Sequence, residues 1–327
     1  MRYLITGGAG FIGSHLAAAL IQRGDHVVAL DDLSTGSTDN IASLADSAQF
    51  RFEHGSILEG SLVSSLVANC DAVAHLAASV GVQLIVQRPL ESLVNNIKGT
   101  EVVLEACARF RRRVLVTSTS EIYGKNATGP LREDADRILG SPFKARWSYS
   151  TAKAVDEILA YAYWRERGTP STVVRLFNTV GPGQSGAHGM VIPRFVRQAL
   201  RGEDVTVYGS GEQQRCFCHV DDTVRALIAL FDHPAAVGDV FNVGAPYEIT
   251  MNDLARTVIE RTGSSSRVTH IPYDLAYEAG FEDMERRIPD TGKVQALTGW
   301  EPIRDLGVIL VDVIDHERAR LAVRAGG

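Results

Sequence analysis

Tyr149 and Lys153 form the pair of residues whose types and spacing point most directly to chemistry. They stand at i and i+4 in the segment Tyr-Ser-Thr-Ala-Lys, so on a helix they lie one above the other on the same face. A phenol is a poor base near neutral pH, but a neighbouring ammonium stabilises the phenolate and lowers its pKa. Such a tyrosine takes a proton from an alcohol while the carbon of that alcohol gives up a hydride. The pair also occurs on ordinary helices, so its meaning depends on its surroundings.

A second polar cluster follows the apolar run 114–117, which is typical of a buried strand. Ser118, Thr119 and Ser120 place a row of hydroxyls where the carboxyl end of this strand is expected, and ligands bind at that edge of a parallel sheet. Glu121 comes two positions after Thr119, so on a continued strand it faces the same side. We therefore expect a carboxylate close to the substrate.

The glycine-rich segment Gly7–Gly13 follows the first apolar run and opens a helical pattern. Glycines with this spacing make a tight turn and let a pyrophosphate approach the N-terminus of the helix. The second expected strand ends at Asp31, 18 residues after Gly13, where a carboxylate accepts hydrogen bonds from both ribose hydroxyls and repels a 2'-phosphate. We expect NAD as the cofactor, with Asp32 turned the other way by strand alternation.

The elements that carry these residues alternate between short apolar runs and longer helical patterns. This alternation predicts an α/β fold, a Rossmann-type doubly wound parallel sheet covered by helices on both faces. After residue 176 glycine, proline and polar turns become frequent. We expect an NAD-binding Rossmann domain at 1–176 and a smaller α/β substrate-binding lobe at 177–327, with some exchange of chain between the two. The expected strands are 3–6, 26–30, 50–52, 72–76, 114–117 and 172–176. The clearest helices are 14–23 and 98–109, and a few more are expected in the second lobe near 192–201, 223–231 and 251–261.

Composition excludes several other classes of function. With 33 Lys+Arg against 39 Asp+Glu the chain lacks the cationic field that a nucleic-acid partner requires. No apolar run is long enough to cross a membrane, and the first residues carry no leader pattern. The four cysteines show no C-x-x-C spacing, so we expect reduced thiols, no metal site and a cytoplasmic protein. His75, at the end of an expected buried strand, is interpreted as a hydrogen-bonded core side chain.

Taken together, these motifs resemble those of the extended short-chain dehydrogenase/reductase family, which contains the NAD-dependent sugar-nucleotide epimerases, dehydratases and decarboxylases. The resemblance covers almost the whole chain. It rests on the glycine loop, Asp31, His75-Leu-Ala-Ala78, Asn96-Ile-Lys-Gly-Thr100, Ser118–Gly124, the Tyr149/Lys153 pair, Arg175-Leu-Phe-Asn178 and Arg287-Ile-Pro-Asp290.

This resemblance implies a set of site residues and partners. The catalytic residues are Thr119, Glu121, Tyr149 and Lys153. The cofactor-binding residues are Gly7, Gly10, Phe11, Ile12, Gly13, Asp31, Ser56, Ile57, Leu76, Ala77, Tyr149 and Lys153. The substrate, a nucleotide sugar expected to be UDP-linked, is bound by Val80, Ser120, Asn178, Val191, Arg215 and Arg287. Arg215 falls in a segment interpreted as a loop. Helices near 98–109 and 149–164 match those that pair two subunits in relatives, which implies a homodimer.

Three positions depart from the family's pattern. Ser56 stands where relatives commonly carry an aspartate that binds adenine, Gly183 where an arginine is common, and His188 where many have tyrosine. The first departure weakens the expected adenine contact, and the other two lie on the substrate side.

The resemblance leaves three reactions open, all starting with oxidation at C4 of the sugar. A 4-epimerase returns the hydride to the other face and needs no further acid or base. A 4,6-dehydratase needs a base for the C5 proton, and a decarboxylase loses carbon dioxide from a uronic acid whose C4 ketone lies β to the carboxylate. Thr119-Ser120-Glu121 resembles the decarboxylases and also GDP-mannose dehydratases, and residues 213–217 look decarboxylase-like. We favour UDP-glucuronate decarboxylation over epimerisation of a UDP-hexose, dehydration, or a non-catalytic NAD-sensing role.

Overall fold

A seven-stranded parallel sheet forms the base of the molecule, in the order β11-β6-β5-β4-β1-β2-β3. The computed structural model describes residues 1–79, 88–126, 128–144, 146–186, 190–276, 284 and 286–325. The strand order runs outward in both directions from β1 and β4, which is the doubly wound arrangement predicted from the sequence. The strands are β1 (Arg2–Thr6), β2 (His26–Asp31), β3 (Phe50–His54), β4 (Ala72–His75), β5 (Arg113–Thr119), β6 (Ser171–Leu176) and β11 (Val240–Val243).

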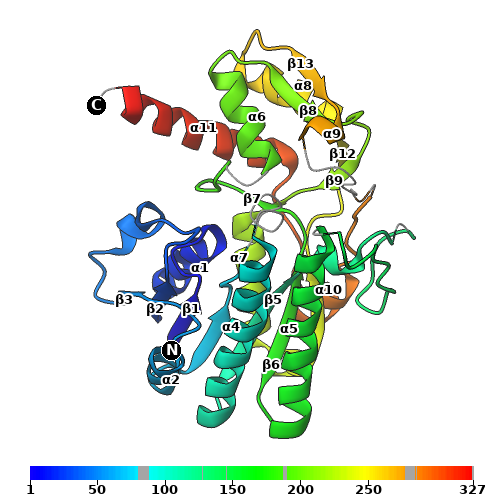
Figure 1. Ribbon diagram of the computed structural model, residues 1–327. Helices are drawn as coiled ribbons and strands as arrows, with labels where there is room; N and C mark the ends of the chain where they lie inside the picture. The colour runs from blue at the N-terminus through cyan, green and yellow to red at the C-terminus, as the bar shows by residue number, and fades with distance from the viewer. Residues whose placement is uncertain are drawn as a thin grey trace.

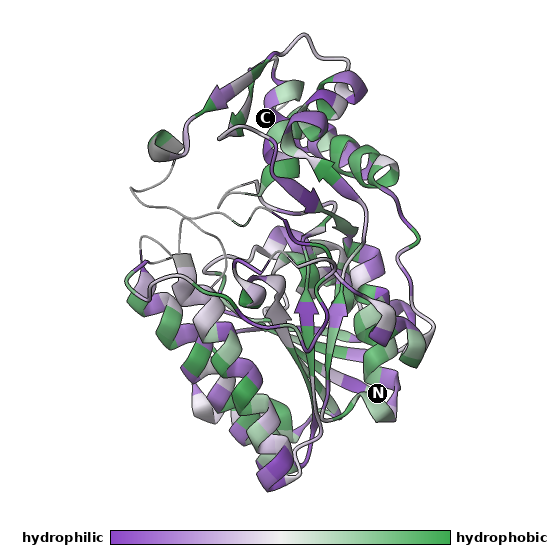
Figure 2. Ribbon diagram, turned by 90° about the vertical axis from the view of Figure 1, so that its right-hand side faces the viewer, coloured by the Kyte–Doolittle hydropathy of each residue, from purple (hydrophilic) through white to green (hydrophobic). Residues whose placement is uncertain are grey.

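Helices cover both faces of this sheet, and the strands between them are largely hydrophobic (Figure 2). Successive side chains of β1 point to opposite faces of the sheet, so they pack in turn into the apolar cores on its two sides. Tyr3 and Ile5 pack into one apolar core and Leu4 into the other. The first core is covered by α1 (Phe11–Gln22), α7 (Val220–Asp232) and α10 (Gly292–Thr298), and the second by α2 (Gly60–Ala68), α4 (Pro89–Phe110) and α5 (Arg146–Arg167).

A smaller lobe lies beyond the carboxyl edge of the sheet (Figure 1). It has an apolar core of its own, to which Phe195, Leu254 and Ile309 contribute. Its elements are α6 (Val191–Leu200), α8 (Met251–Thr262) and α11 (Leu306–Ala325), with the pairs β8 (Val205–Tyr208) and β13 (Val268–Ile271), and β9 (Gln214–Cys216) and β12 (Glu248–Thr250). The chain returns from this lobe to the sheet, since β11 pairs with β6.

Short elements connect these two parts. They are β7 (Thr179–Val180), which pairs with β10 (Cys218–His219), the single-turn α9 (Tyr273–Ala276), and the 3-10 helices η1 (Thr38–Leu44), η2 (Ser120–Tyr123) and η4 (Pro234–Ala236). Within the described part of the chain, no helix is both long and apolar enough to span a membrane.

Candidate active site

A cavity of about 510 Å³ lies between the carboxyl edge of the sheet and the smaller lobe. Its position is the one expected for a ligand in an open α/β sheet. The predicted site residues among the described positions all line it: Gly7, Gly10, Phe11, Ile12, Gly13, Asp31, Ser56, Ile57, Leu76, Ala77, Thr119, Ser120, Glu121, Tyr149, Lys153, Asn178, Val191, Arg215 and Arg287. Val80 and His188 lie outside the described residues. The roles assigned to these residues stay predictions.

The glycine loop at one end of the cavity has no room for a Cβ at Gly7 or Gly13. Gly7 has φ +71°, and a Cβ on Gly13 would lie 2.1 Å from the Gly7 carbonyl oxygen. Gly10 precedes α1 and offers no side chain to cap it. The first turn of α1 therefore lacks a side-chain cap, and an uncapped helix N-terminus suits a phosphate.

Asp31, at the carboxyl end of β2, holds this loop against the sheet. Its carboxylate accepts hydrogen bonds from the backbone N–H of Ala9 at 3.0 Å and of Leu33 at 2.9 Å. Burial raises the pKa of Asp31, and these N–H groups offset part of that rise. A Cβ on Gly36 would lie 2.8 Å from Oδ1 of Asp31, so glycine keeps space open beside the carboxylate. This space and the open helix N-terminus fit the ribose and pyrophosphate of NAD.

The other walls of this end follow β3 and β4. Ser56 Oγ accepts a hydrogen bond from the Leu58 N–H at 3.3 Å, so the hydroxyl at this position shapes its own turn. The Ala77 N–H donates to Thr6 Oγ1 at 3.3 Å, which ties the segment after β4 to β1.

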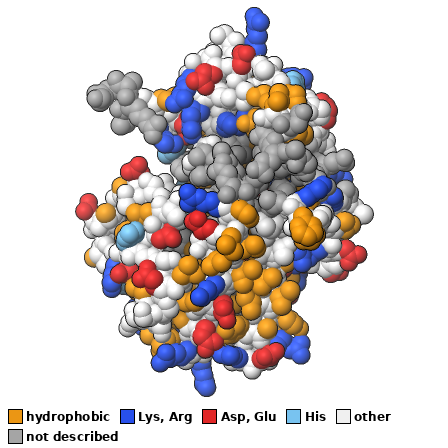
Figure 3. All heavy atoms as spheres, in the orientation of Figure 1, with side chains coloured by type: hydrophobic (Ala, Val, Ile, Leu, Met, Phe, Trp, Pro, Cys, Tyr) orange, Lys and Arg blue, Asp and Glu red, His pale blue; other side chains and the backbone are white. Residues whose placement is uncertain are grey.

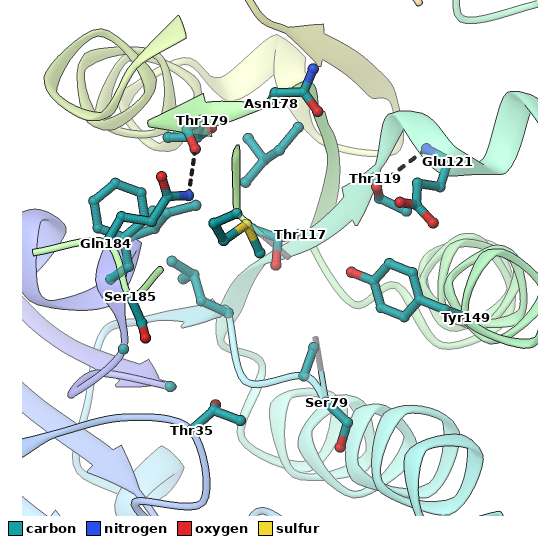
Figure 4. Close-up of a pocket in the computed structure, with 18 of the residues that line it drawn as sticks. Thr35, Ser79, Thr117, Thr119, Glu121, Tyr149, Asn178, Thr179, Gln184 and Ser185 are labelled. Carbon is teal, nitrogen blue, oxygen red and sulfur yellow. Dashed lines mark hydrogen bonds between the residues drawn. The ribbon is translucent and has the colours of Figure 1, made fainter. Parts of the chain in front are cut away.

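Tyr149 and Lys153 enter the cavity from α5. The Tyr149 hydroxyl points into the open space, toward the side where Thr117 lies (Figure 4). Lys153 is almost completely buried, and its Nζ donates to the Thr117 carbonyl oxygen at 3.0 Å. The same Nζ lies 3.1 Å from Oδ2 of Asp156. Both residues lie on the continuous helix α5, so their i, i+4 spacing places them on one face of it.

Glu121 reaches the cavity by a different route from the one expected. The strand β5 ends at Thr119, and Glu121 belongs to the 3-10 helix η2, so its expected place on a continued strand is wrong. Thr119 caps η2, its Oγ1 accepting a hydrogen bond from the Glu121 N–H at 3.2 Å. Ser150 Oγ donates to the Glu121 carbonyl oxygen at 2.8 Å and joins η2 to α5. Figure 4 shows Thr119 and Glu121 beside Tyr149.

Arg287 lies at the substrate end of the cavity, next to the same turn. One Nη is 3.4 Å from Ser120 Oγ and 3.8 Å from a Glu121 carboxylate oxygen, and the other is 3.5 Å from Asn178 Oδ1. Arg215 comes from the smaller lobe. It lies in β9 and is largely buried, so the interpretation of its segment as a loop is wrong at this residue. Two guanidinium groups thus line this end of the cavity from separate segments of the chain.

His75, under the floor of the cavity, is a hydrogen-bonded core side chain, as predicted. Its Nδ1 is 2.7 Å from Thr6 Oγ1 and its Nε2 is 3.0 Å from Thr100 Oγ1. Burial lowers its pKa to about 3, so the ring is neutral near neutral pH. No group of three or more His, Cys, Asp or Glu side chains among the described residues is arranged to hold a metal ion.

Asp156 is a residue near the site that the sequence analysis missed. It is fully buried and lies beneath Lys153. The signal was present in the sequence, because an acid three positions after a lysine on a helix shares its face.

Comparisons with known proteins identify the family. Residues 3–244 match the NAD dependent epimerase/dehydratase family. The chain is 40% identical to a UDP-N-acetyl-alpha-D-glucosaminuronate decarboxylase of Bacillus cytotoxicus over 92% of both chains. It is 34% identical to UDP-glucuronic acid decarboxylase 1 of Xenopus tropicalis, over 99% of this chain and 74% of that protein.

Solved structures give the same result for the fold. A UDP-glucose 4-epimerase of Thermotoga maritima superimposes with a TM-score of 0.89 at 31% identity, covering 98% of this chain and all of that one. A UDP-glucuronic acid 4-epimerase of Bacillus cereus, solved with UDP-glucuronic acid and NAD, gives 0.88 at 29% identity, over 98% of this chain and all of the other. The predicted fold, family and cofactor are confirmed: the chain belongs to the NAD dependent epimerase/dehydratase family and is an NAD-dependent enzyme of that family.

Proposed function

We propose that this protein decarboxylates a UDP-linked uronic acid through a 4-keto intermediate. The observation that carries the proposal is the group formed by Glu121 and Arg287, 3.8 Å apart, beside Tyr149 in the cavity. A 4-epimerase needs no acid or base beyond the tyrosine, whereas loss of carbon dioxide leaves C5 in need of a proton. Two relatives named above are decarboxylases of UDP-linked uronic acids, which supports the same reaction.

The residues that hold NAD in this proposal are those of the sheet end of the cavity. The open N-terminus of α1 takes the pyrophosphate, Asp31 the adenosine ribose, and Lys153 the nicotinamide ribose. Ser56, Ile57, Leu76 and Ala77 form the walls. When bound, NAD accepts the hydride from C4 of the sugar in the first step and returns it to C4 in the last.

Tyr149 is the base of the first step. Its phenolate removes the proton of the C4 hydroxyl as C4 loses its hydride, and the C–O bond becomes a ketone. The Lys153 ammonium stabilises the phenolate, and the Thr117 carbonyl oxygen holds that ammonium in place. Thr119 contributes a hydroxyl to the same wall. Tyr149, now protonated, donates a hydrogen bond to the ketone oxygen.

The C4 ketone makes the second step possible, because the C6 carboxylate is now β to a carbonyl. The C5–C6 bond breaks, carbon dioxide leaves, and the electron pair forms an enolate whose charge falls on the C4 oxygen beside Tyr149. Glu121 takes up a proton from solvent and delivers it to C5, which restores the ketone. Return of the hydride to C4 and of the Tyr149 proton to its oxygen completes the cycle, so the net change is loss of carbon dioxide and uptake of one proton.

The remaining polar residues hold the substrate. We infer that Arg287 and Ser120 face the sugar and its carboxylate, because both lie next to Glu121. Arg215 of β9 suits the diphosphate, since a guanidinium pairs well with phosphate oxygens. Asn178 and Val191 line the path between them toward the nucleoside.

Product analysis tests the proposal. The protein is incubated in turn with UDP-glucuronate, UDP-N-acetylglucosaminuronate and UDP-glucose, and the products are examined by mass spectrometry and NMR. We expect one of the two uronates to lose carbon dioxide, and the preferred one reports whether the site favours a hydroxyl or an acetamido group at C2. A product of unchanged mass from either uronate would indicate epimerisation, and loss of water would indicate dehydration.

We also propose a homodimer formed through α4 and α5. Both helices present apolar side chains to solvent, among them Leu90, Val94, Ile158 and Tyr161, with Ile158 63% exposed. Figure 3 shows hydrophobic side chains gathered on the face of these two helices. Light scattering of the Ile158→Glu variant tests this, with Ile303→Glu as control because Ile303 is 64% exposed elsewhere. We expect a monomer from the first and a dimer from the second; a dimer from both would contradict the proposed interface.

A cytoplasmic location is proposed on the state of the thiols. All four cysteines, Cys70, Cys107, Cys216 and Cys218, are free and buried, which suits a reducing compartment. Cell fractionation tests this, and recovery from a secreted or membrane fraction would contradict it.

A further inference from the structure

Asp156 is a fully buried acid that the chemistry proposed above does not use. It follows Tyr149 and Lys153 along the same face of α5, at i+7 and i+3 respectively. Its Oδ2 lies 3.1 Å from the Lys153 Nζ, and the two side chains are 0% and 2% exposed. The Lys153 ammonium thus has the Thr117 carbonyl oxygen on one side and the Asp156 carboxylate on the other.

Among the described residues, the groups next to this ion pair on α4 and β4 are a neutral hydroxyl and a neutral imidazole. Thr100 of α4 contributes a hydroxyl. His75 of β4, on the far side of Thr100, is neutral because burial lowers its pKa to about 3. Glu157, the adjacent acid on α5, is paired with Arg175 of β6 by two hydrogen bonds of 2.9 and 2.8 Å.

The Lys153–Asp156 ion pair acts on neighbouring charges because both of its side chains are buried. Burial raises the pKa of Asp156, and the Lys153 ammonium and the Thr100 hydroxyl offset part of that rise. A buried ion pair adds little net stability in comparison with apolar side chains of the same size. Its effect on neighbouring charges is larger, since water does not screen them.

We propose that Asp156 is a positioning residue, the ionised counter-charge of Lys153, and that it sets the pH range in which Tyr149 takes the C4 proton. This inference rests on the proposed function only for the role of Tyr149 as the base. With Asp156 ionised, the resting group of phenol, ammonium and carboxylate is neutral. Without that carboxylate the group carries one positive charge and gives up its first proton at lower pH.

In a fraction of the molecules, that first proton then leaves Lys153 and not Tyr149. An ammonium that has lost its partner in a buried site is easier to deprotonate, so a share of the molecules holds neutral Lys153 beside a protonated, inactive Tyr149. Loss of the Asp156 charge therefore shifts the acid limb of the rate profile to lower pH and also lowers the plateau.

The test is the rate of C4 oxidation in the holoenzyme with Asp156→Asn. Bound NAD is mixed with the preferred UDP-sugar, and the appearance of reduced nicotinamide is followed by stopped-flow absorbance over a range of pH. We expect the acid limb to move down by roughly 0.5 to 1 pH unit and the plateau to fall by about tenfold. An acid limb at the same pH as in the unchanged protein, or at higher pH, would overturn the inference.

Three further variants separate charge from structure. Asp156→Glu keeps the charge and is expected to restore the position of the acid limb. Asp156→Ser is a second neutral variant with the same expected shift as the asparagine, so the test does not depend on the folding of one protein. Asp222→Asn is the matched control, because Asp222 is equally buried but belongs to α7 and pairs with Arg225 and Arg304. It is expected to lower the melting temperature without moving the acid limb.

The two proposals fail in distinguishable ways. If the unchanged protein reduces its bound NAD with none of the UDP-sugars, the proposed function fails. If it does so with a normal acid limb that Asp156→Asn leaves in place, only the inference about Asp156 fails.

Discussion

Glu121 is the residue whose surroundings separate the three reactions of this family. Its backbone is fixed twice, by Thr119 Oγ1 through its N–H and by Ser150 Oγ through its carbonyl oxygen. Its carboxylate lies within 3.8 Å of an Arg287 nitrogen. An acid held this firmly at the end of β5 suits proton transfer at one carbon of the substrate, which only decarboxylation and dehydration require.

Replacing Glu121 by Gln removes the proton that C5 needs but leaves Tyr149 and Lys153 in place. We expect C4 oxidation to continue, so that reduced nicotinamide accumulates on the enzyme, while release of the decarboxylated product slows by about 10²-fold or more, the usual contribution of one acid or base. Single-turnover absorbance and product mass measure the two effects. A variant that turns over at the original rate would argue for epimerisation.

For single residues, the sequence predicted well which side chains line the cavity. It predicted less well which elements carry those side chains. Glycine spacing, Asp31 and the Tyr149/Lys153 pair are local patterns, and each lines the cavity. The route of Glu121 through a 3-10 turn depends on a cap by Thr119, and alternation along a strand does not reveal where the strand ends. The contact between Arg287 and Ser120 joins residues far apart in the chain, so only the fold brings them together.

The turn from β1 into α1 has little conformational freedom. Gly7, in a left-handed conformation, and Gly13 approach so closely that a Cβ on the second would lie 2.1 Å from the carbonyl oxygen of the first. This contact is between backbones, so it cannot be relieved by a side-chain movement. The approach of helix to strand depends on glycine at position 13.

Replacing Gly13 by Ala is expected to force the turn open, with loss of retained NAD and a fall of about 1–3 kcal/mol in the free energy of unfolding. Gly60→Ala is the matched control, because Gly60 starts α2 with nothing within 4 Å of the added carbon. Urea unfolding and the nicotinamide content of the purified protein measure both. Equal behaviour of the two variants would contradict this account of the turn.

The strands β1, β2, β4, β5 and β6 were predictable because each is a largely buried and mostly apolar run. The strand β3 is partly exposed and was predicted from Phe50 and Phe52 alone. The ends differ from the structure by one or two residues at most positions, as at β5, which extends to Thr119. Several elements were not among those predicted, and two of them show why. The strand β11 is only four residues long and its pairing with β6 is non-local. The helix α11 mixes apolar and charged residues without one clear stripe. The domain boundary at residue 176 stays a prediction.

The cavity lies where the sheet and the smaller lobe meet. His75, beneath the floor of this cavity, makes the stability of the whole molecule depend on pH. His75 is completely buried, and burial lowers its pKa from 6.5 to about 3. Below about pH 6.5 the unfolded chain takes up a proton on this ring while the folded protein does not. The free energy of unfolding therefore falls as the pH falls through this window.

Uptake of one such proton changes the free energy of unfolding by at most about 1.4 kcal/mol per pH unit. Burial raises the pKa of Asp31 and of Asp156, and raised carboxyl pKa values work in the opposite direction, so the contribution of His75 must be isolated by substitution. We expect His75→Gln to lose stability less steeply than the unchanged protein between about pH 6 and 4. Urea unfolding at each pH measures this, and parallel curves would show that His75 is not the group responsible.

The central claim is that Tyr149, Glu121 and a returning hydride act in turn on one bound sugar. The most direct measurement is the reaction of the preferred UDP-uronate in deuterium oxide, with the product read by NMR. We expect a sugar that has lost its C6 carboxylate, carries one deuterium at C5 and keeps its original hydrogen at C4. Deuterium at C4, or a product that retains C6, would contradict it.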